Sequence, residues 1–311
     1  MIHTFYVYIA LLSYMIGGNN PFLWEKWENI KYANVSAEET LNIYLPKNET
    51  GGKLAALVIL GEGTWRDSIL NNALKRGYAA VTVNYRSIKT APFPAAIQDV
   101  NAAIKWLKGF GRKYNISPDK LILCGAGEGG YLAALAAVSE SYQDGVMAQI
   151  EFGSQPVSIE AQNSEQQNQY WIDLFNIFPG SNRQTGRELS RQHPKVAGVI
   201  DFYGYTKNIG KLQISNSELN KTKAAVQTSV ANYVTPVTPP FLLICGENDR
   251  IVPLAETKAL YNTLRENLCP PGTAKCPVQL IVIPDSWHGG DKFESPEITM
   301  QVFDFIHSIM N

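Results

Sequence analysis

The sequence predicts an α/β fold in which a mostly parallel central sheet carries helices on both faces. Strand-like and helix-like segments alternate from about residue 41 onward, and this alternation is typical of parallel sheets whose strands are joined by helices. The strand-like segments are mostly continuous apolar runs, as expected of strands that are buried on both faces.

Seven segments are predicted to be strands. Residues 41–45 alternate in apolar character, whereas residues 54–60 form an unbroken apolar run. The other five predicted strands are 79–85, 120–124, 196–203, 240–245 and 278–283.

The predicted helices lie between these strands. The clearest covers 97–114, where Ile97, Val100, Ile104 and Leu107 recur at steps of three and four residues, which is the spacing of one helix face. Segments 254–268 and 296–310 also read as helices.

Residues 139–193 interrupt the alternation. They are rich in Gln, Ser and Asn, and we expect a small lid-like excursion over the carboxyl edge of the sheet, where open α/β sheets bind ligands. The alternative is a surface loop without regular structure. The aromatic stretch 170–178 favours packing of at least part of this segment.

Composition is that of an ordinary globular domain. The chain has 311 residues, of which 45% are apolar and 18% charged, and a single domain over 19–311 fits this size. The net charge is −1 and no Lys/Arg run exceeds two residues, so a nucleic-acid partner is not expected. No metal-ligand or phosphate-binding motif is present, and we predict no cofactor.

Residues 1–18 contain no Asp, Glu, Lys or Arg and hold an apolar stretch too short to span a bilayer. We expect a signal peptide and a secreted protein with no stable membrane span in its mature form. The alternative is an apolar N-terminal helix on a cytoplasmic protein. Four N-x-S/T sequons, at Asn34, Asn48, Asn115 and Asn220, agree with export.

Two of the four cysteines, Cys269 and Cys276, bracket a short loop. An oxidised pair there would contribute about 2–3 kcal/mol to stability. Cys124 and Cys245 lie in apolar strand-like runs and are expected to be buried thiols.

The segment 121–137, LILCGAGEGGYLAALAA, combines a buried strand, a glycine-rich turn and an apolar helix. Such a turn presents the nucleophile of many hydrolases in the pattern G-x-S-x-G. The pattern aligns here with Gly125 to Gly129, and its serine position is Gly127.

Two further residues follow predicted strands. They come in the chain order nucleophile, acid, histidine that accompanies such a turn. Asp249 comes after the strand 240–245, and His288 follows the strand 278–283 and precedes two glycines. A carboxylate can orient an imidazole that transfers protons. Taken singly, Asp249 is equally well a turn-capping residue and His288 a surface residue; together, in order, they favour an acid–base pair.

The chain resembles the small α/β-hydrolase esterases of the BD-FAE-like and acetyl- or feruloyl-esterase group. The relatives of this group include kynurenine formamidase and the hormone-sensitive-lipase-like carboxylesterases. The resemblance is carried by the segment 84–137, by PPFLLICGENDRIVP at 239–253 and by WHGGD at 287–291. It covers roughly 41–309 apart from the excursion. It implies an α/β-hydrolase fold, a carboxylic ester substrate of the short-chain, carbohydrate or feruloyl kind, and Gly127 at the nucleophile position.

The resemblance also implies an oxyanion-binding loop at 60–65, LGEGTW. The family's histidine position is Leu60 here and one glycine is Glu62, while Gly61 and Gly63 remain. Glu128, whose backbone N–H would supply a further donor, is a second acidic residue. A carboxylate about 4 Å from an oxyanion would oppose it by about 4 kcal/mol, so these two glutamates do not suit acyl chemistry.

Three aromatic residues, Trp65, Tyr131 and Trp287, are candidates to line a substrate pocket for an aromatic or sugar group, the alternative being simple packing. Ser286 and Cys124 are less favoured substitute nucleophiles, because neither lies on the turn.

Three functions remain open. The first is an esterase-like protein with little or no serine-hydrolase activity that binds a small ester-like ligand or a protein partner. The second is a weak hydrolase in which His288 and Asp249 activate water. The third is an active esterase in which Gly127 is a Ser substitution.

Overall fold

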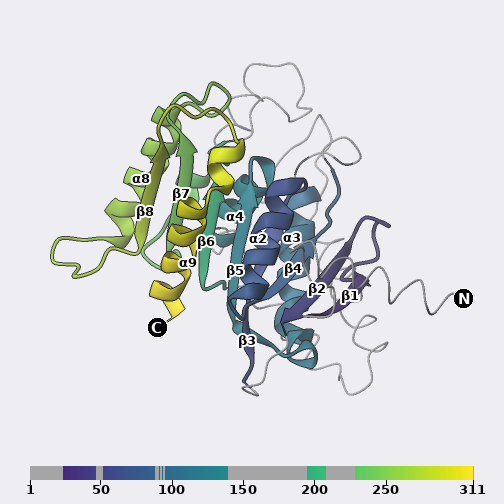
Figure 1. The fold of residues 1–311 in the computed structure, drawn as a ribbon. Helices are drawn as coiled ribbons and strands as arrows, with labels where there is room; N and C mark the ends of the chain where they lie inside the picture. Colours follow the sequence, from purple (N-terminus) through teal and green to yellow (C-terminus); the bar gives the residue numbers. More distant parts are fainter. Residues whose placement is uncertain are drawn as a thin grey trace, which may run out of the picture.

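The computed structural model describes residues 24–46, 52–87, 91, 93, 95–138, 195–207 and 228–310. They form one eight-stranded sheet with the strand order β1-β2-β4-β3-β5-β6-β7-β8 (Figure 1). This confirms the predicted α/β class. The expected signal peptide at 1–18 and the excursion at 139–193 lie outside the described residues.

Six neighbouring strands are parallel and two at one edge are antiparallel. The sheet consists of β1 (Trp24–Lys31), β2 (Thr40–Pro46), β3 (Leu54–Leu60), β4 (Ala79–Val83), β5 (Ile116–Ala126), β6 (Gly198–Phe202), β7 (Phe241–Gly246) and β8 (Val278–Ile283). β1 pairs antiparallel with β2, and β2 with β4. The strands from β4 to β8 run parallel, so their carboxyl ends meet at one edge of the sheet.

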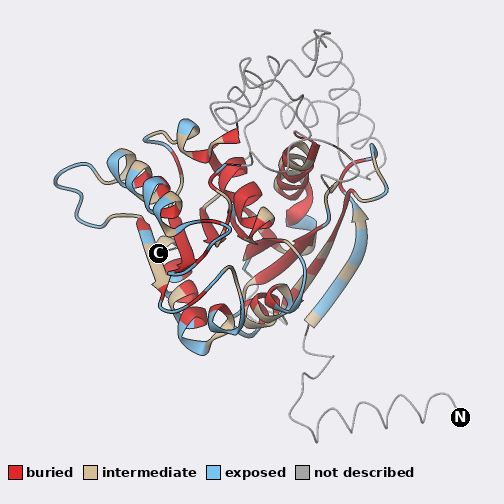
Figure 2. Ribbon diagram, turned by 90° about the horizontal axis from the view of Figure 1, so that it is seen from above, coloured by how far each residue is buried: buried red, intermediate tan, exposed pale blue. Residues whose placement is uncertain are grey.

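Helices cover both faces of this sheet. Their bounds are α2 (Thr64–Lys75), α3 (Ala95–Phe110), α4 (Glu128–Val138), α8 (Leu254–Leu268) and α9 (Pro296–Met310), with short 3-10 turns η1 (Gly111–Tyr114), η4 (Val230–Tyr233) and η5 (Asp291–Glu294). Helices α2 and α9 pack in one core, and α3, α4 and α8 pack in the other. Figure 2 shows that the buried residues concentrate in the central strands and the helix faces turned toward them.

Two predicted boundaries are corrected. The predicted strand 79–85 ends at Val83, because the chain then turns so that Arg86 pairs with the buried Asp99. The predicted helix 97–114 ends as an α-helix at Phe110 and continues only as a 3-10 turn. That turn is closed by Asn115 in the left-handed conformation, with φ of 58°.

The edge strand β1 was not predicted. Its register shifts between Trp27 and Ile30, where Asn29 has a φ of 56°. A bulge of this kind breaks the two-residue alternation that marks a strand in sequence.

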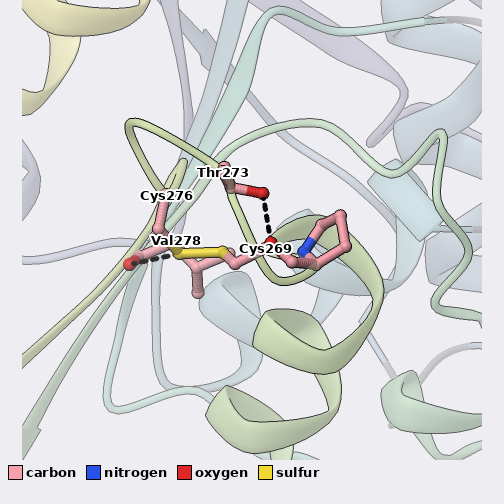
Figure 3. Close-up of a disulfide and its surroundings, with 5 residues drawn as sticks. Cys269, Thr273, Cys276 and Val278 are labelled. Carbon is pink, nitrogen blue, oxygen red and sulfur yellow. Dashed lines mark hydrogen bonds between the residues drawn. A yellow bond between two sulfur atoms is a disulfide. The ribbon is translucent and has the colours of Figure 1, made fainter.

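A disulfide joins Cys269 and Cys276, so the pair considered in the sequence as a possible bridge is oxidised, with the two Cα atoms 5.2 Å apart. It closes the loop between α8 and β8, and the Thr273 hydroxyl donates to the Pro270 carbonyl inside that loop (Figure 3). Among the described residues, no helix is both long and apolar enough to cross a membrane.

Candidate active site

The glycine-rich turn lies between β5 and α4, at the carboxyl edge of the sheet. Gly127 has a φ of 56°, a left-handed conformation that glycine adopts without the cost that a side chain adds. Its N–H donates to the Phe202 carbonyl at 2.9 Å, and its carbonyl accepts from the Tyr131 N–H at 3.0 Å. The turn is therefore fixed on one side by β6 and on the other by the first turn of α4.

The neighbouring glycines allow the turn to approach two strands closely. A Cβ atom at Gly129 would overlap the carbonyl of Leu60 at the end of β3, and one at Gly130 would overlap the Asp201 carboxylate on β6. Glycine is thus required at both positions for steric reasons. The close approach of Gly129 to β3 and of Gly130 to β6 fixes the position of the turn relative to the ends of these strands.

Asp249 and His288 form a hydrogen-bonded pair beside the turn. Asp249 Oδ2 lies 2.8 Å from His288 Nδ1. Asp249 Oδ1 accepts from the N–H groups of Ile251 and Val252 at 2.8 and 2.9 Å. The Asp249 side chain is fully buried and that of His288 is 17% exposed, so the carboxylate is fixed while the imidazole is accessible.

The imidazole of His288 faces the glycine-rich turn at Gly125–Gly129, which we call the elbow. A Cβ atom built on Gly127 would lie 3.7 Å from His288 Nε2 and 3.9 Å from Tyr203 Cε2, with no closer neighbour. These are ordinary van der Waals distances, so the space beside Gly127 admits a small side chain. The structure thereby brings together Gly127, Asp249 and His288.

The loop expected to bind an oxyanion lies beside the elbow. Strands β3 and β5 are parallel and pair Leu60 with Gly125, so the residues that follow each strand are neighbours. Gly61 and Gly63 have φ of 121° and 92°. Gly63 also precedes α2 and accepts from the Arg66 N–H.

Both glutamates of this region act on the phenol of Tyr85. Glu62 is exposed and Glu128 is half-buried. The pKa of Tyr85 is raised, first by burial and then by the negative charges of Glu128 and Glu62. Both carboxylates therefore lie near enough to Tyr85 to disfavour ionisation of its phenol.

The three aromatic candidates lie in different surroundings. Trp65 is 5% exposed and packs edge-on against Phe202, with ring centroids 5.1 Å apart. Tyr131 is fully buried and donates its hydroxyl to the Thr228 carbonyl. Trp287 is 55% exposed beneath the guanidinium of Arg250. Of the three, only Trp287 offers its ring to solvent.

The substitute nucleophiles Ser286 and Cys124 are buried, as is the second free thiol, that of Cys245. Cys124 and Cys245 are not disulfide-bonded, and burial raises the pKa of both thiols, that of Cys245 to about 11. Ser286 is 4% exposed. Because a thiolate is the reactive form of cysteine, neither thiol is activated in this environment.

Sequence reasoning did not single out Tyr203 and Asp201, which both lie at the end of β6. Tyr203 is a non-glycine residue with a φ of 44°, and its ring lies 4.9 Å from that of His288. Asp201 is buried, and burial raises its pKa to about 7. A signal was available: β6 lies between β5 and β7, so residues at its carboxyl end must adjoin both the elbow and Asp249.

No group of three or more His, Cys, Asp or Glu side chains suited to a metal ion occurs within the described ranges.

The BD-FAE family model matches residues 41–264. The chain belongs to the BD-FAE family. Esterase LipQ of Mycobacterium tuberculosis is 26% identical over 247 residues, which is 76% of this chain and 52% of LipQ. The probable carboxylic ester hydrolase LipM of the same organism is 20% identical over 275 residues, 85% of this chain and 56% of LipM. The chain thus spans about half the length of these relatives.

Solved structures show the same fold. A truncated carbohydrate esterase from gut microbiota has a TM-score of 0.67 at 24% identity, with 92% of this chain and 97% of that chain covered. Esterase 2 of Thermogutta terrifontis has a TM-score of 0.60 at 15% identity, with 93% and 95% covered. This BD-FAE member therefore has the fold of an esterase-like α/β-hydrolase.

Proposed function

We propose that this protein is an esterase-like α/β-hydrolase whose serine-hydrolase activity is absent or strongly reduced because Gly127 occupies the nucleophile position. One observation carries the proposal. The Cβ position at Gly127 lies 3.7 Å from His288 Nε2, so the residue that faces the base has no atom with which to attack.

The lack of a side-chain oxygen at Gly127 removes catalysis through an acyl-enzyme. In serine esterases of this fold, the elbow hydroxyl gives its proton to the imidazole and its oxygen bonds to the acyl carbon. The alcohol then leaves with the proton from the imidazolium, and water later releases the acid. Without a side-chain oxygen at Gly127 no acyl-enzyme forms there, and the first of these steps does not occur.

The acidic residues beside the elbow also support reduced serine-hydrolase activity. An oxyanion is stabilised by donors aimed at the developing negative charge. Here Glu62 follows β3 and Glu128 begins α4, so two acidic residues border the glycine-rich turn. We propose that the site binds a small ester-like ligand or a protein partner without acyl transfer.

The intact pair Asp249–His288 favours a second candidate, hydrolysis by water. A water molecule beside Gly127 would give a proton to His288 Nε2 while its oxygen bonds to the ester carbon. The tetrahedral intermediate would collapse to the acid, and the leaving alkoxide would take the proton from the imidazolium. The 2.8 Å bond from His288 Nδ1 to Asp249 would orient the base in both steps.

Hydrolysis of p-nitrophenyl acetate distinguishes these functions. The variants are Gly127→Ser, which adds a hydroxyl, and Gly127→Ala, which adds the same Cβ without one. We expect the wild type and Gly127→Ala to be nearly inactive and Gly127→Ser to be at least about a thousandfold faster. Adding His288→Ala to Gly127→Ser should remove the gain.

Other outcomes separate the alternatives. Slow hydrolysis by the wild type that His288→Ala abolishes would support the water route. Rapid turnover by the wild type, at rates ordinary for esterases, would contradict the proposal.

We also propose export from the cytoplasm. The disulfide Cys269–Cys276 supports an oxidising compartment. Sequencing the N-terminus of protein recovered from the medium would test it, with a start near residue 19 expected and purely intracellular protein contradicting it.

A further inference from the structure

We propose that Tyr203 is a positioning residue that aims the His288 imidazole at residue 127. This inference goes beyond the proposed function and rests on it only for its kinetic test. The hydrogen bond to Asp249 fixes the Nδ1 side of the ring. A second contact is needed to set the direction of Nε2, and Tyr203 supplies it.

The ring of Tyr203 meets the imidazole edge-on. Their centroids are 4.9 Å apart and their planes lie at 64°, a favourable aromatic geometry. The same ring borders the space at residue 127, where Tyr203 Cε2 lies 3.9 Å from the built Cβ atom. His288 Nε2 and the Tyr203 ring are thus the groups nearest to the space that a side chain at residue 127 would occupy.

Tyr203 is itself firmly placed. Its N–H donates to the Ile244 carbonyl at 2.7 Å, and its ring packs edge-on against Phe293 at 4.8 Å. The next N–H, that of Gly204, donates to Asp201 Oδ1 at 2.8 Å. These contacts hold Tyr203 at its φ of 44°, a conformation that costs free energy in a residue with a Cβ and that clusters at functional sites.

The loop that carries His288 is shaped around this ring. A Cβ atom at Gly289 would lie 3.2 Å from both Cζ and Oη of Tyr203, which leaves little room for a side chain. Gly289 has a φ of 87°. The absence of a side chain at the residue after the histidine therefore leaves room for the Tyr203 ring beside the imidazole.

The variants are chosen to separate the ring from the backbone. Tyr203→Phe keeps the ring. Tyr203→Asn removes it, and asparagine tolerates the left-handed conformation better than most residues do. Tyr205→Asn is the matched control, because the Tyr205 ring lies farther from His288, at 5.9 Å.

The first measurement is the proton NMR spectrum of the otherwise wild-type chain. The proton between His288 Nδ1 and Asp249 gives a low-field resonance when the ring is held. We expect this resonance in the wild type, Tyr203→Phe and Tyr205→Asn, and its loss by exchange in Tyr203→Asn. An unchanged resonance in folded Tyr203→Asn would overturn the proposal.

The second measurement is ester hydrolysis in the Gly127→Ser background. Tyr203→Asn should lower kcat by about 100-fold with KM unchanged, whereas Tyr203→Phe should retain kcat. Equal kcat values would overturn the proposal. If Gly127→Ser is inactive, the proposed function fails and the NMR result still decides the role of Tyr203. If Tyr203→Asn does not fold, Tyr203→Gly, which adopts the left-handed conformation freely, takes its place in both measurements.

Discussion

Asp249 Oδ2 lies 2.8 Å from His288 Nδ1, and the other oxygen of this carboxylate accepts two backbone N–H groups, those of Ile251 and Val252. A carboxylate held in this way cannot turn from the imidazole without breaking three hydrogen bonds. Because the carboxylate accepts, the proton of the neutral ring lies on Nδ1 and the lone pair on Nε2, toward residue 127.

The first prediction follows from this tautomer. In the Gly127→Ser background, Asp249→Asn presents an amide that can favour the wrong tautomer, and kcat should fall by about 10⁴-fold. Steady-state ester hydrolysis measures it. Asp285→Asn, in the same region but exposed, should leave kcat unchanged. A small effect of Asp249→Asn would mean that the pair does not act as a base.

The second prediction concerns the negative charges beside the elbow. In the Gly127→Ser background, replacing both Glu62 and Glu128 by Gln should raise kcat, because the carboxylates oppose a developing oxyanion. The gain should shrink as salt is added, since Glu62 is exposed and its charge is screened. Rates measured at low and high ionic strength test this. A fall in kcat would show that a glutamate assists the reaction.

Much of the fold could be predicted from the sequence, because the signals are local. Continuous apolar runs mark β3, β7 and β8 with bounds close to those observed. The edge strand β1 carries no such run, and its bulge at Asn29 disrupts the alternation. Its position depends on pairing with β2, which a local pattern does not encode.

The residues of the site also differ in whether local sequence signals could predict them. Gly127, Asp249 and His288 each follow a strand, and the order of these strands in a parallel sheet brings them to one edge. The end of β6 could be placed near the site from the strand order, but the contact of Tyr203 with His288 could not be predicted, because it depends on a left-handed backbone and a ring contact far along the chain.

The third prediction tests the close approach of the elbow to β3. Gly129→Ala would normally stabilise a helix, by about 1 kcal/mol, but here the added Cβ would overlap the Leu60 carbonyl. We expect the free energy of unfolding to fall by about 1–3 kcal/mol, measured by urea denaturation. Gly52→Ala, where no atom lies within 4 Å of the added Cβ, is the control. A stabilised Gly129→Ala protein would contradict this packing.

The fourth prediction concerns the buried carboxyl of Asp201. Burial raises its pKa from 3.8 to about 7, so between these values the folded state binds more protons than the unfolded state. Stability from this group is present below pH 4 and is lost as pH rises through 7, by up to about 4 kcal/mol. Its neighbours Cys124 and Cys245 have raised pKa values and stay neutral in this range.

Asp201→Asn removes this titration and keeps an oxygen for the Gly204 N–H. The unfolding free energy of the variant relative to the wild type should therefore increase between pH 4 and pH 8. Urea denaturation at several pH values measures this difference. A difference that stays constant with pH would show that Asp201 does not titrate in this way.

We propose that Gly127 holds the nucleophile position beside the assembled Asp249–His288 pair. The most direct test of this proposal is covalent labelling with a fluorophosphonate, in which an activated serine oxygen displaces fluoride from phosphorus, followed by peptide mass spectrometry. We expect no adduct on the wild type and a single adduct at residue 127 of Gly127→Ser that His288→Ala suppresses. An adduct on the wild type, at Ser286 for example, or an unlabelled but folded Gly127→Ser protein would contradict it.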